Sequence, residues 1–371
     1  MRLRHAVAAA ATSALGAGAA VLAAGRYGSG LALNPALAGP AREGLVTVHR
    51  VTADRVVLTR TPATARPAVY GLSGAGVHAT VGEVTDSAAH TVTRRLLTVG
   101  KGELRPGAFV RIVPQAYTGD PRSAFGLDAQ DVEITGELGL MPAWRLSAAR
   151  RTWVIAVHGV GATREQVLPV LPALHRFQLP VLVPAYRNDP GAPASPDGLA
   201  HLGDTEWQDL DAAMRYAVEH GALRLVLYGW STGAAMALRA LHQSPVRDRV
   251  RAMVLDSPVL DWRSTVSAAV RSRGLPRVLV PLAVRAAEGR TGLHTGRHAE
   301  AALPGRFTVP TLLMHGPDDT FAPWESSREL AERHRGPIAL HTVPGAPHTG
   351  MWNADPKEYE ETLRRFLTPQ M

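Results

Sequence analysis

The sequence predicts an α/β architecture: a mostly parallel sheet with helices on both faces, preceded by a small β-rich domain. From residue 141 to the C-terminus, buried strand-like runs alternate with helical patterns, as they do in a parallel sheet. From 41 to 140, short alternating stretches are broken by Gly, Pro and Asp turns, and no helix of normal length is evident. The third observation is the junction at 225–234, where a buried strand runs directly into a Gly-rich turn and the small-residue start of a helix.

Residues 1–40 are expected to be a signal peptide or signal anchor followed by a linker. Arg2 and Arg4 precede the uncharged stretch Ala6 to Ala24, which is just long enough to span a bilayer. Two early arginines against the later Arg26 favour an N-terminus inside, with the rest of the chain on the far side. The protein is therefore expected at the cell membrane on a single anchor, or secreted after cleavage near the end of this stretch. Because no catalytic candidate lies in this region, its removal is expected to leave the active site unchanged.

The segment 41–140 is predicted to form the β-rich domain. Its expected strands cover 46–51, 55–59, 77–84, 91–99 and 109–113. Nothing in these strands indicates a particular chemistry.

The junction at 225–234 carries the candidate nucleophile. It reads Gly229-Trp230-Ser231-Thr232-Gly233, a Gly-x-Ser-x-Gly motif between a strand and a helix. A serine in this context is held on a strained turn that projects its hydroxyl above the sheet. The flanking glycines are required because a Cβ at either position would collide with the neighbouring strand or helix.

The partners of Ser231 are expected later in the chain. A serine hydroxyl is a poor nucleophile at neutral pH, so it needs a base, and the base needs an orienting carboxylate. After this type of turn the acid comes first and the histidine second. A short strand is followed by a loop with Asp318 and Asp319, and His348 lies in a Gly/Pro-rich loop after the next strand. Asp256, at the end of another strand, is the third candidate for the acid.

The oxyanion hole also has candidates. A tetrahedral intermediate carries a negative oxygen that backbone N–H groups must meet. Thr232, the residue after the nucleophile, is expected to supply one N–H. A buried strand ends at His158-Gly159, and Val160 in the loop that follows is expected to supply the second, with Gly161 as the alternative. His158 itself is expected to bond loop backbone.

Together these elements resemble a bacterial serine α/β-hydrolase, similar to the membrane-anchored lipase-like and monoacylglycerol-lipase-like branch. The resemblance covers residue 141 to the C-terminus and implies the α/β-hydrolase fold. It is carried by His158-Gly159, Tyr186-Arg187-Asn188, Gly229 to Gly233, Asp256-Ser257-Pro258, His315-Gly316 with Asp319, and His348. The family pattern His-Gly-x-x-Asp-x-x-x-Pro maps onto His315, Gly316, Asp319 and Pro323, so it favours Asp319 over Asp318 and Asp256 as the acid. The β-rich segment is a departure, because ordinary esterases lack it.

Residues 262–306 interrupt the alternation of strands and helices with two arginine-rich, helix-like stretches. In this fold, a lid lies between the strand after the nucleophile helix and the strand of the acid. The segment is therefore expected to be either a lid or a pair of ordinary connecting helices.

Composition excludes several classes of function. The 371-residue chain has a formal net charge of +8, but only Lys101 and Lys357 are lysine, a skew typical of a high-GC, actinobacterial-looking genome. No basic run is interleaved with aromatic residues, so nucleic acid is not expected as a partner. The chain has no cysteine, which excludes disulfides, thiolate catalysis and cysteine metal sites.

The leading hypothesis is a serine esterase or lipase that cleaves a carboxylic ester through an acyl-enzyme. Its catalytic residues are Ser231, Asp319 and His348, its substrate is a small-molecule or lipid-like acyl compound, and it requires no metal or organic cofactor. One alternative is a peptidase of the prolyl-oligopeptidase type, which also places an all-β part before its hydrolase core. Here that part has only about a hundred residues, too few for a propeller of several four-stranded blades. The other alternative is a surface-displayed binding protein on an inactive hydrolase fold. The sequence does not indicate an oligomeric state.

Overall fold

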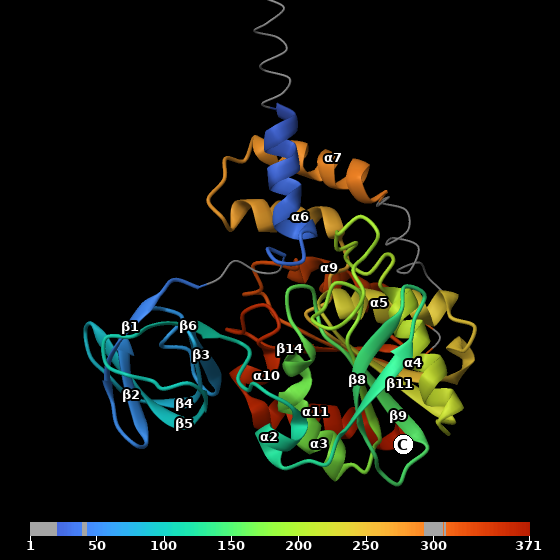
Figure 1. Cartoon of the computed structure of the whole chain (residues 1–371), viewed down its shortest axis with the longest axis horizontal. Coiled ribbons are helices and arrows are strands. Elements are labelled where there is room, and N and C mark those ends of the chain that lie inside the picture. Colours follow the sequence, from blue (N-terminus) through green and yellow to red (C-terminus); the bar gives the residue numbers. More distant parts are fainter. Residues whose placement is uncertain (1–20, 39–42, 293–306, 308) are drawn as a thin grey trace, which may run out of the picture.

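The computed structural model describes residues 21–38, 43–292, 307 and 309–371 (Figure 1). These residues form a closed β-barrel and an 8-stranded sheet with helices packed on it. The predicted fold class is confirmed: a small β-rich unit precedes a mostly parallel, helix-covered sheet.

The barrel has the strand order β1-β2-β5-β4-β3-β6. Its strands are β1 (Val46–Val51), β2 (Arg55–Thr59), β3 (Tyr70–Gly74), β4 (Val77–Ser87), β5 (Thr91–Lys101) and β6 (Phe109–Val113). The core is filled by alternate, inward-facing side chains such as Val48, Leu58, Leu72, Val81 and Ile112. Five of these strands lie where the sequence predicts them, and β3 was not predicted.

The 8-stranded sheet has the order β14-β13-β12-β11-β9-β10-β8-β7. The strands from β9 to β14 pair in parallel, and β7 and β8 are antiparallel. Their bounds are β7 (Gln130–Thr135), β8 (Leu140–Leu146), β9 (Thr152–Val157), β10 (Val181–Pro184), β11 (Arg224–Trp230), β12 (Val250–Asp256), β13 (Thr311–His315) and β14 (Ile338–Thr342). This sheet therefore begins before residue 141, the boundary predicted from the sequence, because β7 pairs with β8.

Helices cover both faces of this sheet. Trp153, Ile155 and Val157 of β9 face one core with α4, α5 and α9, and the alternating Val154 and Ala156 face the other with α3 and α11. Apart from three helical segments described in the next paragraph, the α-helices are α2 (Pro121–Phe125), α3 (Leu171–Arg176), α4 (Trp207–Glu219), α5 (Thr232–Gln243), α9 (Trp324–Arg333), α10 (Met351–Ala354) and α11 (Pro356–Leu367). The 3-10 helices are η1 (Arg164–Val170), η2 (Arg247–Arg249) and η3 (Thr368–Gln370).

Three helical segments form a cap at the top of Figure 1. They are residues 21–33, α6 (Trp262–Arg271) and α7 (Leu279–Thr291). Helices α6 and α7 occupy the described part of the predicted lid segment, and residues 293–306 lie outside the described residues. Among the helices that the structure describes, none combines the length and the apolar character needed to cross a bilayer. Residues 1–20, with most of the predicted anchor, are not among them.

The N-terminal segment is an integral part of this cap. Leu31 and Leu33 are buried in one apolar cluster with Trp262 and Val266 of α6 and with residues of α7. Arg290 Nη1 donates to Ser29 Oγ at 2.9 Å, and Arg273 Nη2 donates to the Leu37 carbonyl at 2.7 Å. The prediction of a signal segment and linker for residues 1–40 did not include this docking: Leu31, Ala32 and Leu33 belong to the core of the cap.

Truncation should therefore depend on where it ends. Removing residues 2–20 should preserve the cap, whereas removing 2–40 should lower the melting temperature and slow labelling of the active-site serine, because the apolar faces of α6 and α7 lose their cover. Calorimetry and the rate of fluorophosphonate labelling of the two truncated proteins would measure both effects.

Two leucines provide a matched control in the full chain. Leu33→Ala should cost about 2–5 kcal/mol of unfolding free energy, since the side chain is fully buried. Leu37→Ala should change it by less than about 0.5 kcal/mol, because that side chain is 48% exposed. Equal effects of the two substitutions would contradict the docking of this segment.

Candidate active site

Ser231 lies on a tight turn between β11 and α5. Its φ of 55° and ψ of −115° lie outside the regions that side chains usually adopt, as expected for a strained nucleophile turn. A Cβ at Gly229 would overlap the backbone of Gly233, and one at Gly233 would overlap the carbonyl of Val157 on β9. The two glycines therefore let the turn, the helix and the neighbouring strand approach closely enough to form the site.

Ser231, His348 and Asp319 lie in one chain of hydrogen bonds. Ser231 Oγ and His348 Nε2 are 2.8 Å apart, and His348 Nδ1 lies 2.6 Å from Asp319 Oδ2. The loop after β14 supplies His348, and the loop after β13 supplies Asp319. Because the carboxyl ends of parallel strands meet at one edge of a sheet, residues far apart in the sequence converge here. All three side chains are buried.

Asp319 accepts hydrogen bonds on both oxygens. Oδ2 also lies 3.0 Å from His315 Nε2, and Oδ1 accepts from the N–H groups of Phe321 and Ala322 at 2.8 and 2.9 Å. Burial opposes ionisation of this carboxyl, but the charge of His348 and the hydrogen bonds from His315 and His348 outweigh it and hold the Asp319 pKa well below its usual range. Asp319 is therefore an anion at every pH near neutrality.

His315 contributes a contact that the sequence analysis missed. Its Nδ1 lies 2.7 Å from Ser327 Oγ on α9, and its ring is fully buried. For Nε2 to donate to Asp319, Nδ1 must accept from the Ser327 hydroxyl. His315 thus positions the same carboxylate oxygen that His348 contacts. The His-Gly motif placed this residue near the acid, but the role depends on Ser327, which no local pattern connects to it.

The other two acid candidates make different contacts. Asp318 Oδ2 accepts from the Gly345 N–H at 2.7 Å, in the loop that leads to His348. Asp256 is fully buried and accepts from Ser257 Oγ at 2.7 Å and from the Tyr359 hydroxyl at 2.8 Å. Burial raises the pKa of Asp256 to about 6, although both hydrogen bonds oppose the shift. Neither carboxylate is hydrogen-bonded to His348 in this structure.

The end of β12 connects the serine turn with the histidine loop. The Ser231 N–H donates to the Asp256 carbonyl at 2.9 Å, and the Val259 N–H donates to the Ser231 carbonyl at 3.1 Å. Ser257 Oγ accepts from the N–H of Thr349, the residue after His348, at 3.0 Å. These bonds hold the turn of Ser231 and the loop of His348 against one strand end.

The raised pKa of Asp256 predicts a pH dependence of stability. In the unfolded chain this carboxyl ionises near 3.8, whereas the native one keeps its proton until pH is about 6. The native state then binds more protons between these values, so stability falls as pH rises from about 4 to about 6. Asp256→Asn does not titrate. Its unfolding free energy should therefore rise by ~2–3 kcal/mol relative to wild type across this window.

Denaturant titrations of both proteins at several pH values would measure this difference. Asp318→Asn is the matched control, because its carboxylate lies at the surface. A difference between Asp256→Asn and wild type that stays constant from pH 4 to pH 7 would contradict the assignment.

The two oxyanion candidates lie side by side. Thr232 is the first residue of α5, so its N–H has no acceptor within the helix. The Val160 N–H donates to the Thr232 hydroxyl at 2.7 Å, so it reaches an oxyanion only after that hydroxyl moves. His158 is fully buried between the carbonyl of Gly159 and the carboxylate of Asp189, and its ring stacks on Tyr186. It supports the loop that carries Val160.

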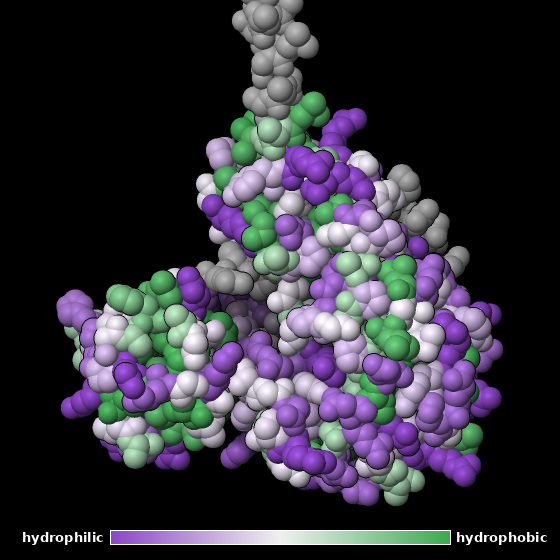
Figure 2. Space-filling model, viewed as in Figure 1, coloured by the Kyte–Doolittle hydropathy of each residue, from purple (hydrophilic) through white to green (hydrophobic). Residues whose placement is uncertain are grey.

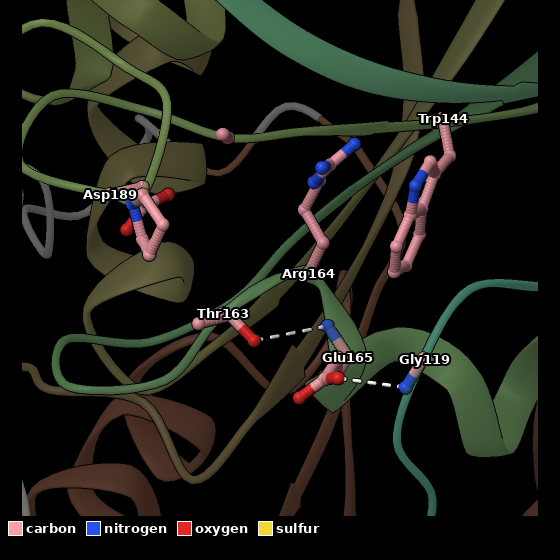
Figure 3. A pocket seen from close by; sticks show the side chains of 8 residues that line it. Gly119, Trp144, Thr163, Arg164, Glu165 and Asp189 are labelled. Carbon is pink, nitrogen blue, oxygen red and sulfur yellow. Dashed lines mark hydrogen bonds between the residues drawn. The ribbon is translucent and has the colours of Figure 1, made fainter. Parts of the chain in front are cut away.

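Two cavities adjoin this loop. The larger, of about 570 Å³, is lined by Val160, Gly161, Tyr186 and Asn188, and also by Asn34 to Ala36 from the N-terminal segment. The smaller, of about 310 Å³, lies between Trp144, Arg164 and Asp189 (Figure 3). Within the described ranges, no three His, Asp or Glu side chains are grouped as metal ligands.

The fold and parts of the chain are similar to known proteins. Residues 196–370 match the prolyl oligopeptidase family, and residues 47–113 match a domain of unknown function. The uncharacterized protein YfhR of Escherichia coli O157:H7 is 24% identical over 259 residues, which are 68% of this chain and 83% of YfhR. The uncharacterized protein YqkD of Bacillus subtilis is 27% identical over 145 residues, 38% of this chain and 47% of YqkD.

Two solved structures have the same fold. The esterase Pf2001 of Pyrococcus furiosus superposes with a TM-score of 0.55 at 22% identity, covering 68% of this chain and 96% of Pf2001. Est1E of Butyrivibrio proteoclasticus, solved with ferulic acid bound, has a TM-score of 0.51 at 16% identity, covering 64% and 98%. The catalytic part of the chain has the α/β-hydrolase fold. Together with the family match, these findings support a serine hydrolase of that fold.

Proposed function

We propose that this chain is a serine hydrolase that cleaves carboxylic esters through an acyl-enzyme. One observation carries the proposal: Ser231 Oγ, both ring nitrogens of His348 and Asp319 Oδ2 form a single hydrogen-bonded chain. The strained turn at Ser231 is typical of a catalytic nucleophile. The lowered pKa of Asp319 keeps its carboxylate charged, as the acid of a catalytic triad requires.

The reaction follows from this geometry. His348 Nε2 takes the proton of Ser231 as Oγ forms a bond with the acyl carbon, and the Thr232 N–H faces the oxygen that becomes negative. His348 gives the proton to the departing alcohol as its C–O bond breaks. A water molecule then loses a proton to His348, attacks the acyl-enzyme and releases the acid, and Ser231 recovers its proton. Asp319 stabilises the imidazolium in both steps.

A peptidase activity is the second candidate, and the match of residues 196–370 to the prolyl oligopeptidase family favours it. The preceding unit of this chain is a small barrel and not a propeller. Acyl esters of 4-nitrophenol and aminoacyl arylamides, assayed with the same full-length enzyme, separate the two candidates. Turnover of arylamides without turnover of esters would select the peptidase.

Labelling tests the common part of both candidates. The full chain should react with a fluorophosphonate at Ser231, and Ser231→Ala should not. Ser264→Ala, which removes a hydroxyl on α6 that bonds Asp261, is the matched control and should label like wild type. If the wild-type protein were not labelled, both hydrolase candidates would be contradicted, and a binding protein on an inactive hydrolase fold would fit better.

We further propose that the N-terminal segment directs the catalytic domain outside the cytoplasmic membrane, tethered or secreted. The supporting observation is the uncharged stretch 6–24 after Arg2 and Arg4. Surface protease treatment of intact cells, with the N-terminus of the recovered protein sequenced, tests this. Recovery of protected, full-length protein from the cytosol would contradict it.

A further inference from the structure

A third cavity, of about 420 Å³, lies where the barrel meets the catalytic domain. The barrel contributes Lys101 and Arg111 to its lining, and the loop after β9 contributes Gly161. In the space-filling view of Figure 2, the surface is recessed where the barrel meets the rest of the molecule. Asn353, five residues after His348, fastens the barrel here by donating to the carbonyls of Val69 and Pro114 at 2.7 and 2.8 Å.

The barrel residues of this cavity form one row across four strands. Arg111 of β6 is opposite Ser73 of β3, Ser73 is opposite His78 of β4, and His78 is opposite Lys101 of β5. Residues opposite one another in antiparallel strands project from the same face. The residues that flank this row along the strands, such as Leu72 and Ile112, face the barrel core. The row therefore lies on the outer wall, toward the catalytic domain.

The two cations of the row have no ion-pair partner within the described part of the chain. Neither Lys101 Nζ nor the Arg111 guanidinium forms an ion pair with a described acidic side chain. The carboxylate of Glu165, on the catalytic side, accepts a hydrogen bond from Gln115 Nε2 at 2.6 Å. It also accepts one from the Gly119 N–H at 2.7 Å (Figure 3). His78 Nε2 donates to the Gln115 carbonyl at 3.0 Å, and burial lowers its pKa, so it adds no charge near neutral pH.

The cavity is bordered by the loop that also contacts the serine turn. Gly161 lines both this cavity and the 570 Å³ cavity beside the oxyanion loop. The residue before it, Val160, contacts the Thr232 hydroxyl, and Thr232 follows Ser231 directly. A Cβ on Gly159 would lie 2.7 Å from the Ser231 Cβ, so the loop of residues 159–161 borders the serine turn as well as the cavity lined by Lys101 and Arg111.

We infer that Lys101 and Arg111 bind a negatively charged group of the substrate, a carboxylate or a phosphate, while its ester lies at Ser231. The inference rests on the proposed function and specifies its substrate class. An arginine fork and a lysine ammonium are the side chains that pair with such groups. The barrel thus has a role in selecting substrates.

Paired esters test the inference in the full-length enzyme. The anionic probes are the 4-nitrophenyl monoesters of adipic and suberic acid, and the neutral ones are 4-nitrophenyl hexanoate and octanoate. Wild type should prefer an anionic ester in kcat/KM by about 10- to 100-fold over its neutral counterpart, the ratio expected for a charge-assisted contact. The double variant K101Q/R111Q should reduce this ratio to near one, mainly through KM. The control R50Q/K357Q removes the same charge from exposed positions elsewhere and should keep the ratio.

A binding measurement separates this inference from the proposed function. Calorimetry with the Ser231→Ala protein should show tighter binding of the adipic monoester than of the hexanoate, and K101Q/R111Q in that background should abolish the difference. Equal binding of the two esters would overturn the inference even where esters are cleaved. Binding of inorganic phosphate that is lost in K101Q/R111Q, without any preference among esters, would assign the cavity to a free anion and overturn the substrate role. Absence of labelling and turnover would instead refute the function.

Discussion

Ser231→Ala and His348→Ala should each reduce kcat by about 10⁴- to 10⁶-fold, and the double variant should be no worse than either. The reason is that Ser231 Oγ and His348 Nε2 act together. Without Nε2 the serine hydroxyl keeps its proton, and without Oγ the imidazole has no nucleophile to activate. Their separation of 2.8 Å permits direct proton transfer. Steady-state kinetics on a 4-nitrophenyl ester measures all three variants.

His334→Ala is a suitable control, because that histidine lies buried at the C-terminal end of α9 and packs against Phe307, with ring centroids 4.7 Å apart. It is not part of the hydrogen-bonded chain of Ser231, His348 and Asp319. It should alter stability more than kcat. More than about a tenth of wild-type activity in His348→Ala would show that another group acts as the base.

The candidate site could be predicted because its signals are local. The strand, the turn and the helix around Ser231 are consecutive in the chain, and the glycines at 229 and 233 are explained by contacts of that turn. His348 and Asp319 were predicted from the loops that follow two strands, and the structure places both at hydrogen-bond distance. Parallel strands bring their carboxyl ends to one edge, so chain order alone indicated which loops would meet.

What could not be predicted depends on contacts between distant segments. The sequence pattern of β3 is interrupted by Gly71, where the backbone of Gln115 approaches so closely that a Cβ does not fit. That contact forms only when the barrel closes, so the sequence pattern does not predict it. The docking of 21–33 on α6 and α7 was missed for the same reason: an apolar N-terminal stretch has the same composition whether it enters a membrane or a protein core. The cationic row of Lys101 and Arg111 likewise exists only in the register of four paired strands.

Asp319→Asn should leave the fold intact and reduce kcat by up to about 10⁴-fold, because it selects the wrong tautomer of His348. The surroundings of residue 319 dictate how the new amide is oriented. Two backbone N–H groups, of Phe321 and Ala322, require an oxygen on one side, so the amide NH₂ must face the two histidines. His348 Nδ1 then becomes an acceptor, its proton moves to Nε2, and Nε2 can no longer accept the proton of Ser231.

Asp256→Asn provides the matched comparison, since that carboxylate is equally buried but bonds Ser257 and Tyr359 instead of His348. It should reduce kcat far less than Asp319→Asn does. A severe loss in Asp256→Asn combined with a mild one in Asp319→Asn would move the acid to the end of β12. In that case His348 would have to turn away from Asp319 during turnover, and the 2.6 Å contact would belong to a resting arrangement.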